Sequence, residues 1–183
     1  LSSVGILGEN NSTLSNSGKI KISGVSSAGI YGQDSDITNS GLKTANKGIY
    51  VEEAQSVGIF GVVSGVATSN KAINNKGYII TKKTESAGIY GKINSGVTNK
   101  LSIVNGTTGN ITVNGNKSVG IFAKNEAGTV ANLNINNTGT INVNKEESIG
   151  IYAPKSTVSG VGKITLDNAA NKSIGVYAAA GSA

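Results

Sequence analysis

The sequence predicts an all-β fold: a single-stranded parallel β-helix (β-solenoid) of about six coils, with three short strands in each coil. Two repeated segments support this prediction. One is a pentad that starts Ser-x-Gly-apolar and ends on an aromatic residue in six of its seven copies, and the other is a Gly-led apolar segment that precedes each later pentad. The composition agrees, because 26 Gly occur beside one Pro and no Met, Trp, Cys or His. A fixed period decides the architecture before local propensity does.

The pentad is predicted to form one strand of each coil. Its copies start 24 to 32 residues apart. They occupy residues 3–7, 27–31, 56–60, 86–90, 118–122, 148–152 and 173–177. Successive side chains of a strand point to opposite faces. If Val119, Ile121 and Ala123 face the core, Phe122 faces outward, beside a furrow of Gly120-type residues.

The Gly-led segment is predicted to be a second strand, and the looser interval from each pentad to the next Gly-led segment holds a third. The Gly-led segments occupy residues 18–22, 48–51, 77–80, 109–113, 139–143 and 162–166. Leu133 and Ile135 alternate with Asn134, so the third strand is apolar on one face only. Coils stacked about 4.8 Å apart would bury that face and pair each strand with its equivalents. A β-propeller is the competing repeat fold, but its blades need about 40 residues and four antiparallel strands.

Asn-x-Gly triplets precede several of the second strands. They occupy residues 16–18, 46–48, 75–77 and 137–139. Asn and Gly adopt left-handed backbone at the lowest cost. The triplets therefore predict turns with left-handed backbone at these places.

Composition and charge narrow the function. The formal net charge is +6, and all 16 basic residues are Lys, spread from Lys19 to Lys172 without a dense cluster. A nucleic-acid surface concentrates basic residues on one face, so no nucleic-acid partner is expected. Neither a signal segment nor a long apolar run is present, so no membrane contact by this stretch is expected. Since the chain starts and stops in mid-repeat, residues 1–183 are interpreted as one continuous repeat region of a longer protein.

The last residue of the pentad provides the candidate ligand surface. One aromatic ring per coil would stack in a ladder, and the sequence leaves open whether that ladder faces inward or outward. If it faces outward, it could accept a sugar ring or a partner strand. Alternatively, the ladder only stabilises the stacking of the coils. The candidate residues are Tyr31, Phe60, Tyr90, Phe122, Tyr152 and Tyr177.

Charged residues recur in the turns between the second strand and the pentad, at residues 52–53, 82–83, 85 and 145–147. They are expected to line up along one edge, as solvated turns or as a binding edge. Asp34 and Asp36 are closely spaced carboxylates, but no calcium-binding repeat surrounds them. A capping or turn role is expected for Asp36, and no metal, cofactor or catalytic residue is predicted.

The pentads, such as Ser118-Val119-Gly120-Ile121-Phe122, interleaved with Asn-x-Gly-x-Ile segments, resemble the passenger repeats of large classical (type V) autotransporter adhesins of Gram-negative oral anaerobes. The resemblance covers residues 3–178. It implies display on the bacterial outer membrane, possibly with release, and adhesion to host receptors, glycans or other bacteria. It also implies anchoring by a C-terminal barrel that this sequence lacks.

Within that resemblance the segment is either the binding surface or the rigid stalk that presents one. A binding insertion is expected in the longest intervals, residues 30–47 and 90–108. The alternative is a carbohydrate-active β-helix enzyme, a polysaccharide lyase or hydrolase. We expect no enzyme, because the ten carboxylates are scattered and the sequence contains neither Arg nor His.

Overall fold

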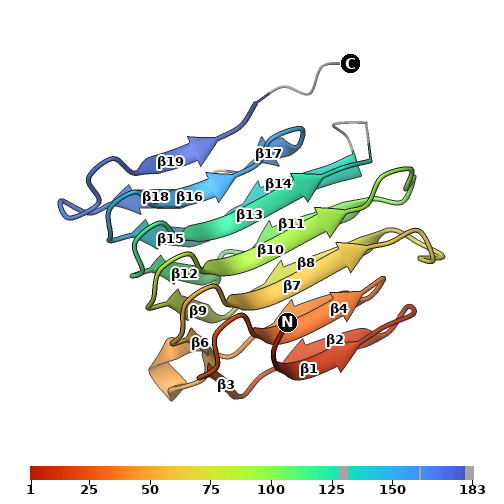
Figure 1. Cartoon of the computed structure of the whole chain (residues 1–183), viewed down its shortest axis with the longest axis horizontal. Helices are drawn as coiled ribbons and strands as arrows, with labels where there is room; N and C mark the ends of the chain where they lie inside the picture. The colour runs from red at the N-terminus through yellow and green to blue at the C-terminus, as the bar shows by residue number, and fades with distance from the viewer. Residues whose placement is uncertain (128–131, 161, 180–183) are drawn as a thin grey trace.

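The computed structural model describes residues 1–127, 132–160 and 162–179. The chain winds through three parallel sheets, one strand per sheet in each coil, which confirms the predicted parallel β-helix (Figure 1). In each coil the chain passes through sheet A, then sheet B, then sheet C. Among the described residues, no helix is long and apolar enough to cross a membrane.

Sheet A contains the pentads. Its strands are β1 (Val4–Gly8), β4 (Ala28–Gln33), β7 (Val57–Val63), β10 (Ala87–Ile93), β13 (Val119–Asn125), β16 (Ile149–Tyr152) and β19 (Ile174–Tyr177). Sheet B holds β2 (Thr13–Asn16), β5 (Asp36–Asn39), β8 (Lys71–Asn75), β11 (Leu101–Asn105), β14 (Leu133–Asn137) and β17 (Thr157–Ser159). Sheet C holds β3 (Lys19–Ile22), β6 (Gly48–Val51), β9 (Tyr78–Thr81), β12 (Asn110–Val113), β15 (Thr140–Val143) and β18 (Lys163–Leu166). These strands make six coils, numbered here from β1–β3 to β16–β18, and β19 begins a seventh.

The core is a set of isoleucine columns that run along the axis of the solenoid. In coil 4, Ile89 of sheet A, Ile103 of sheet B and Ile111 of sheet C are each 0% exposed. Each pairs in register with its equivalent in the next coil, as Ile89 does with Ile121. Burying one such side chain contributes about 1.5–3 kcal/mol, so three per coil form a thin but continuous core.

The Gly of the pentad faces this core, which corrects the expected furrow of Gly120-type residues. A Cβ on Gly120 would lie 2.5 Å from the carbonyl oxygen of Gly150 and 3.0 Å from Cγ2 of the core residue Ile141. Gly120 and Ile121 are therefore consecutive inward positions, and Val119 faces outward with Phe122. The inward assignment of Val119 was wrong because the strand does not alternate strictly here, where the chain turns from sheet C into sheet A.

In coils 2 to 6 the Ser of the pentad is buried at this same corner. The backbone N–H of Ser27 donates to Oγ of Ser56 at 3.1 Å, and the same bond links each pentad Ser to the next as far as Ser173. The Ser56 hydroxyl in turn donates to the carbonyl oxygen of Gly24 at 3.0 Å. A buried backbone donor without a partner costs free energy, so this column satisfies groups that the sheets leave unpaired.

Left-handed backbone recurs one residue before that Ser, and not at most of the Asn-x-Gly triplets. Residues with φ between 52° and 56° there are Ser26, Gln55, Glu85, Lys117, Glu147 and Lys172. Of the four Asn residues that begin the triplets, only Asn46 has positive φ. The prediction was therefore wrong for the other three, whose side chains turn inward.

Those inward Asn side chains form a second polar column, at the end of sheet B. Asn39 Nδ2 donates to Asn75 Oδ1, Asn75 to Asn105, and Asn105 to Asn137, each at 2.8 Å. Asn16 continues the column with a 2.9 Å bond to Asn39. Asn39, Asn75 and Asn105 are 0% exposed. The column stabilises the stack from inside, because each amide both donates and accepts.

Candidate functional site

The six predicted aromatic residues stack in one ladder on the outer face of sheet A. Neighbouring ring centroids are 4.5–5.3 Å apart along the series Tyr31, Phe60, Tyr90, Phe122, Tyr152 and Tyr177. Tyr177, in the last strand, is 41% exposed, and the other five rings are half-buried. Such contacts stabilise the stack by about 0.5–1.5 kcal/mol per pair and still leave ring surface open to solvent.

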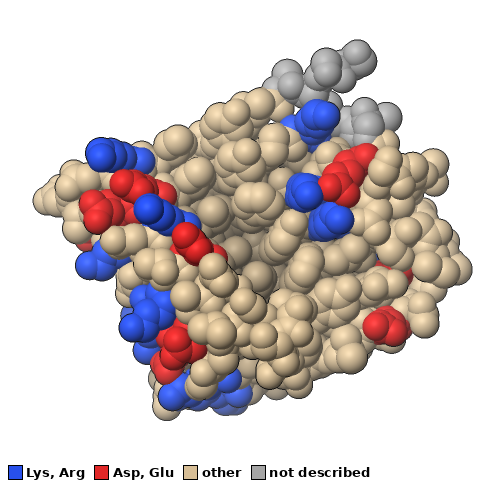
Figure 2. Space-filling view, in the orientation of Figure 1, with Lys and Arg blue, Asp and Glu red and all other residues tan. Residues whose placement is uncertain are grey.

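A furrow runs beside the ladder, and its floor is the column of Val119-type residues. In coils 3 to 5, a hollow of about 380 Å³ is lined by Val57, Ala87 and Val119 together with the rings of Tyr90 and Phe122. In the same region, Figure 2 shows a broad uncharged surface, hollowed near its centre, between charged groups at its two sides. An apolar floor between polar rims is the kind of surface that binds a ligand from solution.

Charged residues form both rims of the furrow. On the side toward the sheet B corner, Glu126 pairs with Lys124 at 2.8 Å and with Lys92 at 3.2 Å. Hydrogen bonds from these two ammonium groups lower the pKa of the Glu126 carboxyl. Burial raises the pKa of the neighbouring Tyr90 hydroxyl, and nearby Lys124 acts against that shift. On the other side Lys117 faces Glu147 at 3.6 Å. The furrow thus offers charged groups of both signs to a ligand on its apolar floor.

The turn charges line up along the corner between sheets C and A, as expected from their spacing. Lys82 contacts Glu52 of the preceding coil at 2.8 Å, and Gln55 donates to Glu85 of the next coil at 3.1 Å. Figure 2 shows charged groups in a column at its left side, where the turns between sheets C and A lie in Figure 1. Salt bridges between exposed groups contribute at most about 1 kcal/mol, so the column is mainly a hydrated edge.

The two closely spaced carboxylates bind backbone groups of the next coil. Asp36, the first residue of β5, accepts with Oδ1 from the N–H of Ala72 at 2.8 Å, so its carboxylate bonds to strand β8 of the next coil and not within a turn of its own. Asp34, fully buried, accepts from the N–H of Ser64 at 2.7 Å and also from the Ser64 hydroxyl. Among the described residues, no group of three or more acidic side chains could hold a metal ion.

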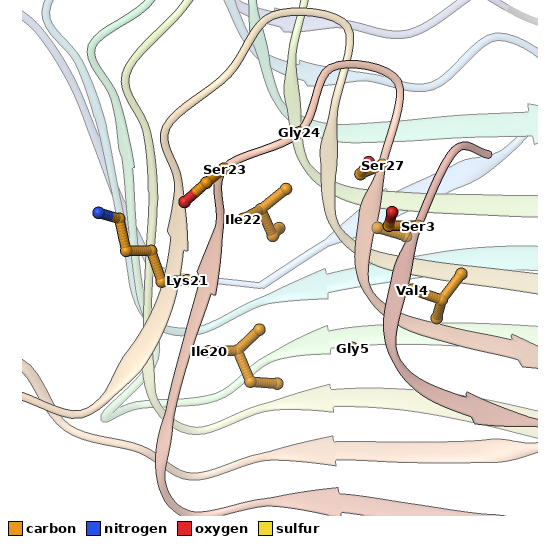
Figure 3. A pocket seen from close by; sticks show the side chains of 10 residues that line it. Ser3, Val4, Gly5, Ile20, Lys21, Ile22, Ser23, Gly24 and Ser27 are labelled. Carbon is orange, nitrogen blue, oxygen red and sulfur yellow. The ribbon is translucent and has the colours of Figure 1, made fainter.

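The N-terminal end of the solenoid opens a separate hollow of about 180 Å³ between β1 and β3 (Figure 3). Ile20 and Ile22 point toward β1 across it, beside Val4 and Gly5. These residues are the first members of the core and pentad columns. The hollow therefore lies where the core column begins in coil 1, and its lining also includes Ser3, Lys21, Ser23 and Ser27.

Two further tyrosines lie outside the pentads, and the sequence analysis missed them as a site. Tyr50 and Tyr78 lie on the outer face of sheet C. Ile80 is paired with Tyr50 in coil 3, and coils 4 to 6 have Asn, Thr or Lys in the paired positions. They were detectable as the two aromatic residues that do not fit the pentad. Comparison of the chain with protein-family models, with curated proteins and with solved structures finds no match.

Proposed function

We propose that this chain is a surface-exposed adhesin segment of the autotransporter passenger type and that the furrow of sheet A is its adhesive surface. The observation that carries the proposal is the continuous ladder of half-exposed rings beside an apolar floor with charged rims. Aromatic rings of this kind stack on sugar rings and pack against partner side chains. The partners are accordingly a host-cell receptor or glycan, or the surface of another bacterium.

A rigid solenoid suits this role physically. Each coil is paired to its neighbours through three parallel ladders, so the rings keep a fixed spacing without binding energy being lost to ordering them. The cell surface of a Gram-negative bacterium is the location that follows from the proposal. Labelling of intact cells with an antibody against the chain tests that location directly, because it detects only displayed protein.

Binding of the purified chain to host cells, glycan arrays and partner bacteria tests the adhesive role. The informative variant replaces Tyr90, Phe122 and Tyr152 by Ser. Its control replaces Thr38, Asn74 and Asn136, which point outward from sheet B, by Ser. We expect saturable binding that the first variant loses and the control keeps, with both variants folded by circular dichroism. Absence of binding by the unaltered chain would replace the furrow proposal with the stalk role.

The enzyme alternative has no comparable support in the furrow. Glycoside hydrolysis needs two carboxyl groups facing each other across the scissile bond, about 5–9.5 Å apart. At the rims of the furrow, Glu85 accepts from Gln55, Glu147 is paired with Lys117, and Glu126 is paired with two lysines. Away from the furrow, Asp34 and Asp36 are both engaged with backbone donors. Adhesion is therefore the function that the furrow supports best.

A further inference from the structure

Coil 2 carries an inserted loop, residues 42–47, on the side of sheet C. Its three-residue 3₁₀ helix η1 (Lys43–Ala45) is the orange turn beside β6 in Figure 1. The loop is clamped at its base, because the N–H of Gly48 donates to the Gly18 carbonyl and the N–H of Tyr78 donates to the Gly41 carbonyl, both at 2.8 Å. The N–H of Lys47 closes it by donating to the Leu42 carbonyl at 3.0 Å.

This insertion lies within one of the two intervals where a binding insertion was expected. The other interval, 90–108, contains no comparable insertion on sheet C. Its extra residues lie between β10 and β11, and the turn between β7 and β8 has the same length. Residues 42–47 are therefore an insertion into the repeat, whereas the turn between β10 and β11 has the length that an ordinary coil has.

Two lysines, one from the loop and one from coil 1, lie over the two tyrosines of sheet C. Lys43 Nζ is 5.2 Å from the centroid of the Tyr78 ring, and Lys19 Nζ is 4.9 Å from that of Tyr50. The two rings are 5.8 Å apart, and Tyr78 is only 4% exposed. Cation–π contact of this kind attracts an ammonium group to the ring and restricts it there. The lysines are thereby positioned before any ligand arrives.

The charge of this cluster is not balanced. Glu52 pairs with Lys21 at 2.9 Å and with Lys82 at 2.8 Å. In the part of the chain that the structure describes, Lys19 and Lys43 have no carboxylate within 4.0 Å, and Lys19 contacts the amide oxygen of Asn46 at 3.2 Å. Two positioned ammonium groups therefore remain available to an anion.

A hollow of about 360 Å³ lies beside Lys43, between the loop and coils 3 and 4. Its polar lining includes Thr44, Thr108 and Asn110. The Thr108 hydroxyl donates to the Lys76 carbonyl at 2.7 Å, so its lone pairs are free to accept. Asn110 accepts from Thr112, and its amide nitrogen has no partner among the described residues. Leu42, 45% exposed, supplies an apolar wall.

We propose that this loop and the adjoining face of sheet C bind an acidic sugar residue of a glycan. Lys43 takes the carboxylate or sulfate, Thr44, Thr108 and Asn110 take the hydroxyls, and Leu42 contacts the apolar face of the ring. Nucleic acid fits less well, because it needs cations along a backbone, and the next outward positions on sheet C are the neutral Asn110 and Thr112. The site is independent of the furrow on sheet A.

Calorimetric titration of the whole chain at low salt tests this site. The probes are a hexasaccharide of galacturonic acid, a sulfated hexasaccharide, a neutral glucose hexasaccharide and a single-stranded oligonucleotide. We expect the acidic sugars to bind and the last two to bind far more weakly. The ratio between the first two distinguishes carboxylate from sulfate recognition. Equal binding of the neutral sugar or the oligonucleotide would overturn the proposal.

The variants locate the binding. Lys43→Gln should weaken it about tenfold or more, the effect of losing one charge-assisted hydrogen bond. Lys163→Gln, an exposed lysine at the far end of the same sheet, should change it less than about twofold. If both variants lost the same affinity for acidic sugars, the effect would come from net charge alone, and the proposed site would be wrong.

A deletion separates the loop from the fold. Removing residues 42–47 joins Gly41 to Gly48 and recreates the spacing of Gly18 and Lys19 in coil 1. We expect a folded chain that has lost acidic-sugar binding, and retained binding would contradict the site. The serine variant of Tyr90, Phe122 and Tyr152 should keep acidic-sugar binding, whereas Lys43→Gln should keep binding at the furrow. Failure of one proposal is thus distinguishable from failure of the other.

Discussion

The Asn column and the aromatic ladder both repeat from coil to coil, yet they have different roles. Asn75 and its equivalents lie inside the corner of sheet B, fully buried and hydrogen-bonded to one another. Tyr90 and its equivalents lie on the outside of sheet A, in contact with one another but half-open to solvent. Periodicity alone does not separate a structural column from a binding surface. The side of the sheet does, because only an outward column keeps surface that a ligand can contact.

The sharpest way to break the comparison uses two adjacent residues on opposite faces. Ile121→Asp places an unpaired charge in the core and should lower the free energy of unfolding by more than about 4 kcal/mol. Phe122→Asp, one residue on, should cost only about 1–2 kcal/mol, since its carboxylate reaches water. Chemical denaturation followed by circular dichroism measures both. Similar losses in the two variants would show that the faces are assigned incorrectly.

The Asn column should be the next most sensitive feature. Asn75→Leu leaves the Asn39 amide donor and the Asn105 amide acceptor without their partner, which should cost about 2–5 kcal/mol. Asn74→Leu, on the outer face of the same strand, is the matched control and should change stability by less than about 1 kcal/mol. Thermal unfolding of both variants tests this, and an unaffected Asn75 variant would remove the column's structural role.

Replacing the inward Gly of the pentad should have the third-largest effect on stability. A Cβ at Gly88 would lie 2.7 Å from the Gly120 carbonyl and 2.8 Å from Cγ2 of Ile111, so Gly88→Ala should cost about 1–3 kcal/mol through displaced backbone. At Gly106 the nearest atoms are 3.5 Å away, and Gly106→Ala should be close to neutral. Denaturation midpoints compare the two. A neutral Gly88→Ala would mean that this column faces outward after all.

Exposed charges should give the smallest effect. Hydrogen bonds from Lys82 and Lys21 lower the pKa of Glu52 from 4.5 to about 2. Because the folded-state pKa is depressed, this stabilisation is present above pH 4.5 and is lost as the pH falls toward 2. Glu52→Gln should therefore remove less than about 1 kcal/mol at pH 7 and almost nothing near pH 2. Denaturation curves at both pH values measure this, and a larger loss at low pH would contradict the pairing.

Part of the candidate site was predictable from the sequence. The pentad places an aromatic residue at one register position in six strands, so parallel stacking had to bring the six rings into line. The floor of the furrow was not predictable. Strict alternation assigns Val119 to the core and Gly120 to the surface, but the chain turns a corner at Gly120, and the two residues exchange sides.

The loop site was even less visible. Asn46-Lys47-Gly48 has the same pattern as Asn16-Ser17-Gly18, yet the stacked equivalent is Asn39-Ser40-Gly41. Only the position of Asn39 in the buried column identifies residues 42–47 as an insertion. Without knowing that Asn39 occupies the buried column, the contact between Lys43 and Tyr78 cannot be predicted from the sequence.

The sequence by itself determined the period, the three strands per coil, the parallel stack and the alignment of the aromatic residues in one column, but not the face on which that column lies. These follow from spacing and alternation, which are local and repeat in every coil. Only the tertiary structure decided which polar residues lie inside, which way the Gly column faces and where the loop packs. Those features depend on the corners, where a side chain's direction is set by contacts with the coils above and below and not by its neighbours in the chain.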